Sequence, residues 1–226
     1  MPTLGFVHTV HRLIPQLAAL TSELFPDVGQ THYLDESTLK EAIALGGLSP
    51  DIVRRVCQLV LLAAERSNLV LLTCSSIGPC AEVAAQMVSV PVLRIDEPMA
   101  EEAVELGRRI GVIATLRSTL QPTADLVERY AAQAGKVVEI KRVLCEGAFE
   151  AAAGGDREEH DRLVLQGLGG LLGPPDPVEV VVLAQASMAR VAERLPEGNL
   201  VPILASPRSG IQRAGERLRA RGRISP

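Results

Sequence analysis

The chain has 226 residues, a formal net charge of −4 and only 2% aromatic residues. This length suits one large domain or two small ones, and the charge gives no field that attracts a polyanion. Single-stranded nucleic acids need aromatic stacking platforms, so we expect no nucleic-acid partner. No apolar run is long enough to cross a bilayer and no secretory leader opens the chain, so we expect no membrane association and a cytoplasmic location.

The thiols show no metal or disulfide spacing. Four cysteines occur without any C-x-x-C pair, and only four histidines accompany them. The neighbours His8 and His11 lack a carboxylate or third ligand at a suitable spacing, so we expect neither a metal site nor a disulfide framework. A reducing compartment also suits a free functional thiol. The cysteines are Cys57, Cys74, Cys80 and Cys145.

Short apolar runs alternate with longer helical patterns along the chain. Strands separated by helices of this length predict an α/β fold with a parallel sheet and right-handed crossovers. Two helix starts carry capping signals: Ser49 precedes Pro50, and Asp156 stands three residues before Glu159. The expected elements are strands 4–7, 32–34, 70–73, 90–96 and 110–114 and helices 13–24, 48–67, 80–87 and 99–109.

The stretch 70–79 organises the chain. Four apolar residues run into Thr-Cys-Ser-Ser-Ile-Gly, which predicts a buried strand, a tight turn and a helix start. Cys74 would then lie at the carboxyl end of a sheet strand, where open α/β sheets bind ligands, and a helix start makes a thiol more acidic. The alternative is a buried structural cysteine. Ser75 and Ser76 can cap the helix or hold a substrate oxygen.

An internal repeat gives the domain organisation. Residues 5–9 match 111–115, residues 70–77 match 181–188, and residues 90–93 match 201–204. The same order recurs at nearly constant spacing, so we expect two Rossmann-like parallel-sheet domains related by a pseudo-two-fold axis. The first comprises 1–98 plus 207–226, whose last segment returns as a final helix, and the second comprises 99–206.

A cleft between the two domains is the expected small-molecule site, lined by matching loops at the strand ends. Thr9 and Thr115 fall at equivalent strand ends, where a hydroxyl and backbone N–H groups can hold a carboxylate. His8, His11 or Arg12 can orient a substrate, act as an acid, or serve surface roles. The expected lining is Thr9, His11, Cys74, Ser75, Ser76, Arg94 and Asp96 from one half, with Thr115, Gln185, Ala186, Ser187, Ser206 and Arg208 from the other.

These features resemble the aspartate/glutamate racemase superfamily, which includes hydantoin racemase, maleate isomerase and arylmalonate decarboxylase. The resemblance rests on the repeat, the turn 73–76 and the position of the turn 183–188. It implies two cysteines facing each other across the cleft, one removing the proton next to a carboxylate and the other returning one. No cofactor or metal is implied. Cys74 matches the first of these cysteines.

Gln185 stands where the second cysteine would be. A glutamine amide cannot exchange a proton as an acid or base. We therefore expect isomerase or racemase-like chemistry on a small carboxylic or amino acid, with Cys74 as acid/base or nucleophile and proton transfer on one face. A decarboxylase or lyase, and a ligand-binding member without turnover, are the alternatives. A homodimer is the default oligomeric state.

Several other polar residues have plain structural interpretations. Arg94 and Asp96 can pair with each other, while Arg208 can act as a fork for a carboxylate. His160 and Asp161 fall in the first turns of a helix and are expected to be exposed. The basic run from Arg208 to Arg223 has roughly helical spacing and predicts a solvated final helix.

Overall fold

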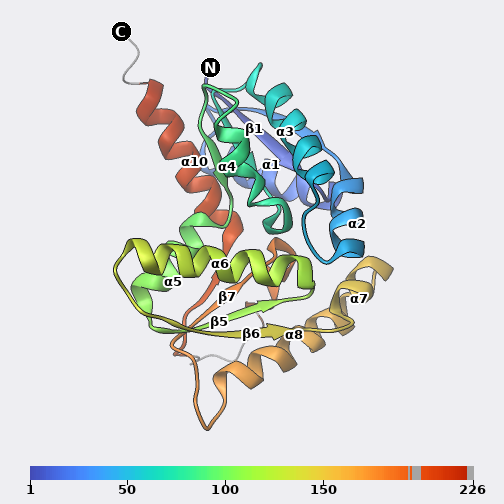
Figure 1. Ribbon diagram of the computed structural model, residues 1–226, viewed down its shortest axis with the longest axis vertical. Coiled ribbons are helices and arrows are strands. Elements are labelled where there is room, and N and C mark those ends of the chain that lie inside the picture. The colour runs from blue at the N-terminus through green and yellow to red at the C-terminus, as the bar shows by residue number, and fades with distance from the viewer. Residues whose placement is uncertain (193, 195–199, 223–226) are drawn as a thin grey trace. The chain divides into compact units, whose positions relative to one another are not determined.

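The computed structural model describes residues 1–192, 194 and 200–222, and the chain forms two compact units. One unit comprises Met1–Glu97 together with the segment that begins at Pro207, and the other comprises Pro98–Ser206. Each contains a four-stranded parallel sheet with helices on both faces (Figure 1), so the predicted α/β fold is confirmed.

The first unit is built around a sheet of order β2-β1-β3-β4. One face of the sheet packs on α3 and α4, and the other packs on α1 and α10 through an aliphatic core. Its elements are β1 (Thr3–His8), η1 (His11–Leu13), α1 (Ile14–Leu24), β2 (Gly29–Leu34), α2 (Glu36–Leu45), α3 (Pro50–Ala64), β3 (Leu69–Leu72), η2 (Ser75–Ile77), α4 (Cys80–Ala85), β4 (Val92–Arg94) and α10 (Ser206–Gly222).

The second unit repeats this plan with the order β6-β5-β7-β8. Helices α5 and α6 cover one face of its sheet, and α8 covers the other (Figure 1). Its elements are α5 (Glu97–Leu106), β5 (Arg109–Ala114), α6 (Arg117–Gln133), β6 (Glu139–Leu144), α7 (Ala148–Gly154), α8 (Arg157–Leu172), β7 (Val180–Leu183), η3 (Ala186–Met188), α9 (Ala189–Ala192) and β8 (Ile203–Ala205).

The repeat extends to the register of the strands. Val7 pairs with Leu72 where β1 meets β3, and Ile113 pairs with Leu183 where β5 meets β7. Strands β3 and β7, each an inner strand of its sheet, are buried along their whole length. A strand buried on both faces must be apolar throughout, which is why both appear as continuous Val and Leu runs in the sequence.

Helix starts follow the capping signals. The Ser49 hydroxyl accepts a hydrogen bond from the Ile52 N–H, and the Asp156 carboxylate accepts one from the Glu159 N–H. Helix α5 is shifted from the expected 99–109, since it starts at Glu97 and ends at Leu106. Arg109 belongs to β5 because it pairs with Glu139 of β6. The Glu179 carboxylate also accepts hydrogen bonds from the Arg108 and Arg109 N–H groups at this end of the sheet.

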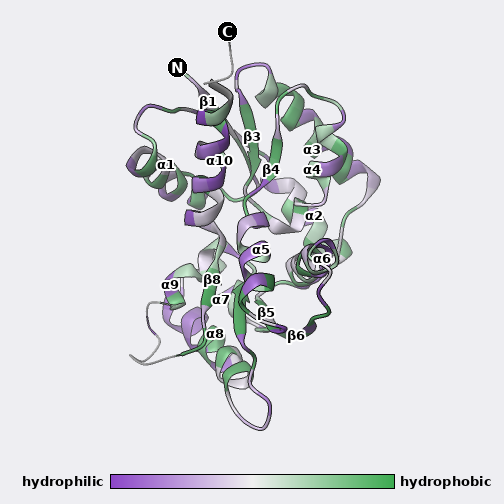
Figure 2. Ribbon diagram, turned by 90° about the vertical axis from the view of Figure 1, so that its left-hand side faces the viewer, coloured by the Kyte–Doolittle hydropathy of each residue, from purple (hydrophilic) through white to green (hydrophobic). Residues whose placement is uncertain are grey.

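The final helix α10 packs on the first sheet. Ile211, Ala214 and Leu218 are buried in the same cluster as Leu4 and other residues of that sheet. The remaining positions of α10 are mostly hydrophilic, as the purple ribbon in Figure 2 shows, whereas the strands beneath it are apolar. Arg223, the last residue of the basic run, lies outside the described residues. None of the helices in the described part of the chain is long and apolar enough to cross a membrane.

Candidate functional site

Thr9 and Cys74 follow neighbouring strands of the first sheet. Val7 and Leu72 are register partners in β1 and β3, so the residues two positions further on leave the sheet at the same edge. Carboxyl edges of parallel strands are where open α/β sheets bind ligands. The structure therefore brings together two of the residues that the sequence singled out.

Cys74 has extended backbone angles and precedes the 3-10 turn η2. The helix start expected directly after it is only this single turn, since α4 begins at Cys80 and is short. Cys74 is partly exposed, whereas Cys57, Cys80 and Cys145 are buried. Burial raises the pKa of Cys80 to about 12 and that of Cys145 to about 11. Among the four thiols, Cys74 is thus the one placed to meet a ligand.

Ser75 and Ser76 are buried in this turn. The turn is closed by the Ile77 N–H, which donates to the Cys74 carbonyl, and by the Gly78 N–H, which donates to the Ser75 carbonyl. A Cβ atom on Gly78 would lie 2.5 Å from Nε of Arg94, so a glycine is needed for the guanidinium to pack there. The Arg94 guanidinium therefore packs directly against the turn that follows Cys74.

Asp96 fixes the Arg94 guanidinium in this place. Arg94 donates from Nε and Nη2 to the two carboxylate oxygens of Asp96, each at 2.9 Å, and both side chains are at most 3% exposed. A bidentate pair of this kind is directional as well as strong. The two residues pair with each other, which was the plain interpretation of their spacing.

His8 lies beneath the site in a buried polar chain. The Thr73 hydroxyl donates to the Val7 carbonyl and accepts from Nδ1 of His8 at 2.9 Å, so Nε2 of His8 accepts from Nδ1 of His32, also at 2.9 Å. Phe6 stacks on both imidazole rings. Burial, with a smaller contribution from His32, lowers the pKa of His8 to about 3. His8 is therefore neutral near pH 7, and its two ring nitrogens are bound to Thr73 and His32. It is thus not placed to donate a proton to a ligand.

The Thr9 side chain differs from its neighbours because its oxygen has no hydrogen-bond partner among the described residues. Thr9 is 3% exposed, and Oγ1 forms no hydrogen bond within the part of the chain that the structure describes. A buried hydroxyl without a partner is costly and requires an explanation. The position next to Cys74 thus contains an unused hydrogen-bonding group.

Two other residues from the expected lining lie at the surface and are paired. His11 Nδ1 contacts the Glu36 carboxylate at 2.6 Å, and the same contact lowers the pKa of Glu36. Arg208 is exposed and donates from Nη2 to Glu23 at 2.8 Å. Both side chains are held by carboxylates of the first unit.

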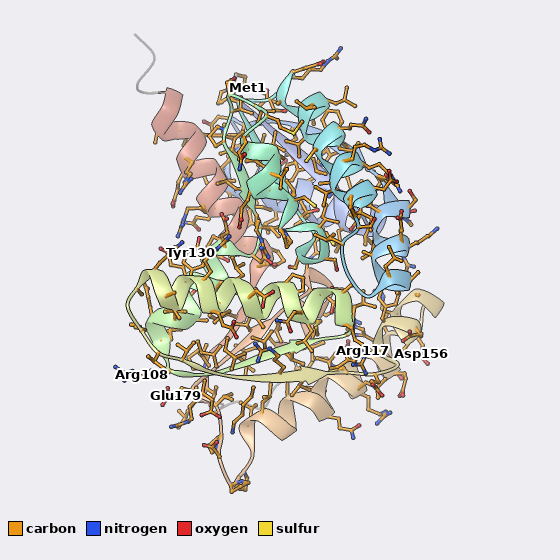
Figure 3. The ribbon with its side chains drawn as sticks, viewed as in Figure 1. Met1, Arg108, Arg117, Tyr130, Asp156 and Glu179 are labelled. Carbon is orange, nitrogen blue, oxygen red and sulfur yellow. The ribbon has the colours of Figure 1, made fainter. Side chains whose placement is uncertain are left out.

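In the second unit, Thr115 and Gln185 are in direct contact. The Gln185 amide oxygen accepts from the Thr115 N–H at 2.6 Å and from the Thr115 hydroxyl at 3.0 Å. Gln185 is partly buried, Ala186 is buried and Ser187 is exposed. Residues labelled in Figure 3 mark the two ends of this unit, since Arg117 and Asp156 open α6 and α8 at one end while Arg108 and Glu179 lie at the other.

The expectation that His160 and Asp161 are exposed is wrong, because both are 1% exposed. Asp161 accepts from Nδ1 of His160 at 2.8 Å and from Arg190 and Arg194 at 2.9 and 2.7 Å. Burial raises the pKa of Asp161, but the hydrogen bonds from His160 and Arg194 and the charge of Arg190 together lower it by more, so the net pKa is below the ordinary value. The two arginines cover the helix start, and nothing in the local sequence indicates partners about thirty positions away.

Comparison with known proteins identifies the family. The sequence pattern described as Asp/Glu/Hydantoin racemase matches residues 8–214. The chain belongs to this family. The match includes strands β2 to β8 and the two turns that contain Cys74 and Gln185. No curated protein matches the chain in sequence.

Solved structures show the same fold at low sequence identity. Glutamate racemase isoform RacE1 from Bacillus anthracis is 17% identical with a TM-score of 0.76, over 99% of this chain and 84% of that one. Glutamate racemase from Escherichia coli is 22% identical with a TM-score of 0.66, over 96% and 82%. Allantoin racemase from Klebsiella pneumoniae is 16% identical with a TM-score of 0.64, over 98% and 89%. The fold of the family is therefore present over nearly the whole chain.

Proposed function

We propose that the protein is a racemase-type isomerase of a small carboxylic or amino acid, working without a cofactor, in which Cys74 transfers the proton. Membership of the Asp/Glu/Hydantoin racemase family supports the reaction class. The single observation that carries the assignment is that Cys74 is partly exposed at the carboxyl edge of its sheet, while the other three thiols are buried. Ser75 and Ser76 supply hydroxyls next to it in the chain, and Thr9 supplies one at the end of the neighbouring strand.

The proposed step is a proton transfer at the carbon next to the carboxylate. The Cys74 thiolate takes this proton, which leaves an enediolate and a neutral thiol, and the thiol returns a proton in the reverse direction. Gln185 occupies the turn that corresponds to the Cys74 turn in the other half, and its amide cannot accept or release a proton. The proposal is therefore exchange on one face, with slow inversion of configuration.

One-sided protonation also favours a second reaction on the same site. Loss of carbon dioxide from a substituted malonate generates the same enediolate, and a single thiol then suffices to protonate it. The observation that favours this alternative is again the glutamine at position 185, because a decarboxylase needs no second proton donor. A ligand-binding protein without turnover is the remaining outcome.

The test is incubation of candidate amino, hydroxy and malonic acids in D2O, read by NMR and mass spectrometry. Deuterium is expected at the α-carbon, or carbon dioxide is expected from a malonate, and Cys74→Ala should abolish either activity. Cys57→Ala is the matched control, since it removes a buried thiol from α3 and should leave the rate unchanged. Acids that bind without exchange or decarboxylation would make the protein a ligand-binding member, and fast inversion would refute one-sided transfer.

A further inference from the structure

Thr9 with Cys74 and Thr115 with Gln185 occupy equivalent positions in the two sheets. Thr9 lies two residues after Val7, and the register partner of Val7, Leu72, lies two residues before Cys74. In the same way, Thr115 lies two residues after Ile113, whose register partner Leu183 lies two residues before Gln185. The backbone bonds around them also recur: the Thr73 N–H donates to the Val7 carbonyl, and the Ala184 N–H donates to the Ile113 carbonyl. The two pairs therefore share the same strand register, while their side chains differ at positions 74 and 185.

The Gln185 side chain shows what this position binds. Two donors of Thr115, its N–H and its hydroxyl, converge on one amide oxygen at 2.6 and 3.0 Å. Because a backbone N–H can only donate, the atom that faces it must be the oxygen and not the nitrogen of the amide. The position is thus a receptor for one sp² oxygen with two lone pairs, which is also the description of a carboxylate oxygen.

In the first unit, no described residue binds the Thr9 hydroxyl at the equivalent position. Cys74 has a shorter side chain than glutamine and no carbonyl group, and the buried Thr9 hydroxyl has no partner among the described residues. A group left unsatisfied in this way loses the free energy of its hydration, so a ligand oxygen that binds it recovers that loss. The unused donor lies beside the thiol that the proposed function assigns to chemistry.

We infer that Gln185 fills an oxygen-binding position with its own side chain, so that a ligand carboxylate binds at Thr9 and is excluded from Thr115. This inference rests on the proposed function for the class of ligand, a small carboxylate. Gln185 is accordingly a residue that determines specificity: it closes one of two equivalent anchors. Thr115 is a positioning residue that holds the glutamine oxygen.

The test uses two alkylating agents of nearly equal size, iodoacetate with a carboxylate and iodoacetamide without a charge. Alkylation of Cys74 is followed by peptide mass spectrometry at increasing reagent concentration. With iodoacetate the rate should saturate, because the reagent binds at Thr9 before it reacts, and with iodoacetamide it should rise linearly. Thr9→Val keeps the shape of the side chain but removes the hydroxyl. It should raise the iodoacetate concentration that gives half of the maximal alkylation rate by about ten-fold or more.

Thr115→Val is the matched control at the equivalent position. It should leave the saturation at Cys74 unchanged, because Gln185 already occupies that receptor. An unchanged iodoacetamide rate in Thr9→Val shows that the turn around Cys74 is intact. Linear iodoacetate kinetics in the unmodified protein, or an equal loss in the Thr9 and Thr115 variants, would overturn the inference.

A second variant tests the occupied receptor directly. Gln185→Cys removes the amide oxygen and places a thiol beside the freed Thr115 donors. The new thiol should show saturating alkylation by iodoacetate, and addition of Thr115→Val should make that alkylation linear. Linear kinetics at the new thiol with Thr115 present would contradict the inference. These readouts report binding and not turnover, so failure of the D2O experiment and failure of this one are distinguishable.

Discussion

The buried histidine beneath the candidate site predicts a loss of stability in weak acid. His8 has a pKa of about 3 in the folded chain because burial disfavours its charged form, and an ordinary value near 6.5 when the chain unfolds. Below pH 6.5 the unfolded state therefore binds a proton that the folded state does not. Stability rises with pH through this window and falls as pH drops from 6.5 towards 3.

The magnitude follows from the two values. Linkage gives about 2 kcal/mol less unfolding free energy at pH 5 than at pH 7 from His8 alone. Any folded pKa below about 4 gives nearly the same figure at pH 5, since the folded chain is then unprotonated at both pH values. His32, whose pKa burial also lowers, adds a contribution of the same sign.

The assay is urea unfolding followed by circular dichroism, because the chain contains no tryptophan. His8→Asn retains a group that can hydrogen-bond to Thr73 and removes the titration, so its difference between pH 5 and pH 7 should be smaller by about 2 kcal/mol. His11→Asn removes an exposed histidine from the same unit and is the control. An equal pH dependence in His8→Asn and the unmodified protein would refute the assignment, whatever the absolute stability of the variant.

Three further outcomes follow from burial and packing. Near neutral pH, Cys74 should alkylate faster than the other three cysteines by peptide mass spectrometry, and faster modification of any of those would show that the thiol is structural. Arg94→Gln leaves a buried carboxylate unpaired and should cost about 3–5 kcal/mol in urea unfolding, whereas Arg208→Gln breaks an exposed pair and should cost no more than about 1 kcal/mol. Gly210→Ala should destabilise by about 1–3 kcal/mol because its Cβ would lie 2.3 Å from the Ile95 carbonyl oxygen, while Gly170→Ala meets nothing within 4 Å and should stabilise α8 slightly.

The sheets could be predicted because burial alone determines their sequences. Strands β3 and β7 are buried on both faces and must be apolar at every position, so both copies were visible as Val and Leu runs. Strand β2 is less regular in sequence, and its full length from Gly29 to Leu34 exceeds the expected 32–34 because backbone pairing with β1 determines it. Helix α2 escaped prediction since its buried face comprises only three residues.

The polar contacts of the site could not be predicted in the same way. Local patterns placed Thr9, Cys74 and Gln185 at strand ends, yet the bond between Thr115 and Gln185 depends on register across 70 positions. The pairing of His8 with His32 likewise joins separate strands. Such contacts depend on which strands are neighbours, and one sequence contains no direct signal for a particular non-local hydrogen bond.

The two copies differ most in the segment that follows the threonines. Helix α6 begins at Arg117, two residues after Thr115, whereas Thr9 is followed by the 3-10 turn η1 before α1 begins at Ile14. The strands before and after these segments retain the same order and register in both units. The order and register of the buried strands are therefore the same in both units although the residues at positions 74 and 185 differ. In the proposed function, the amide at position 185 in place of a thiol accounts for the different roles of the two copies.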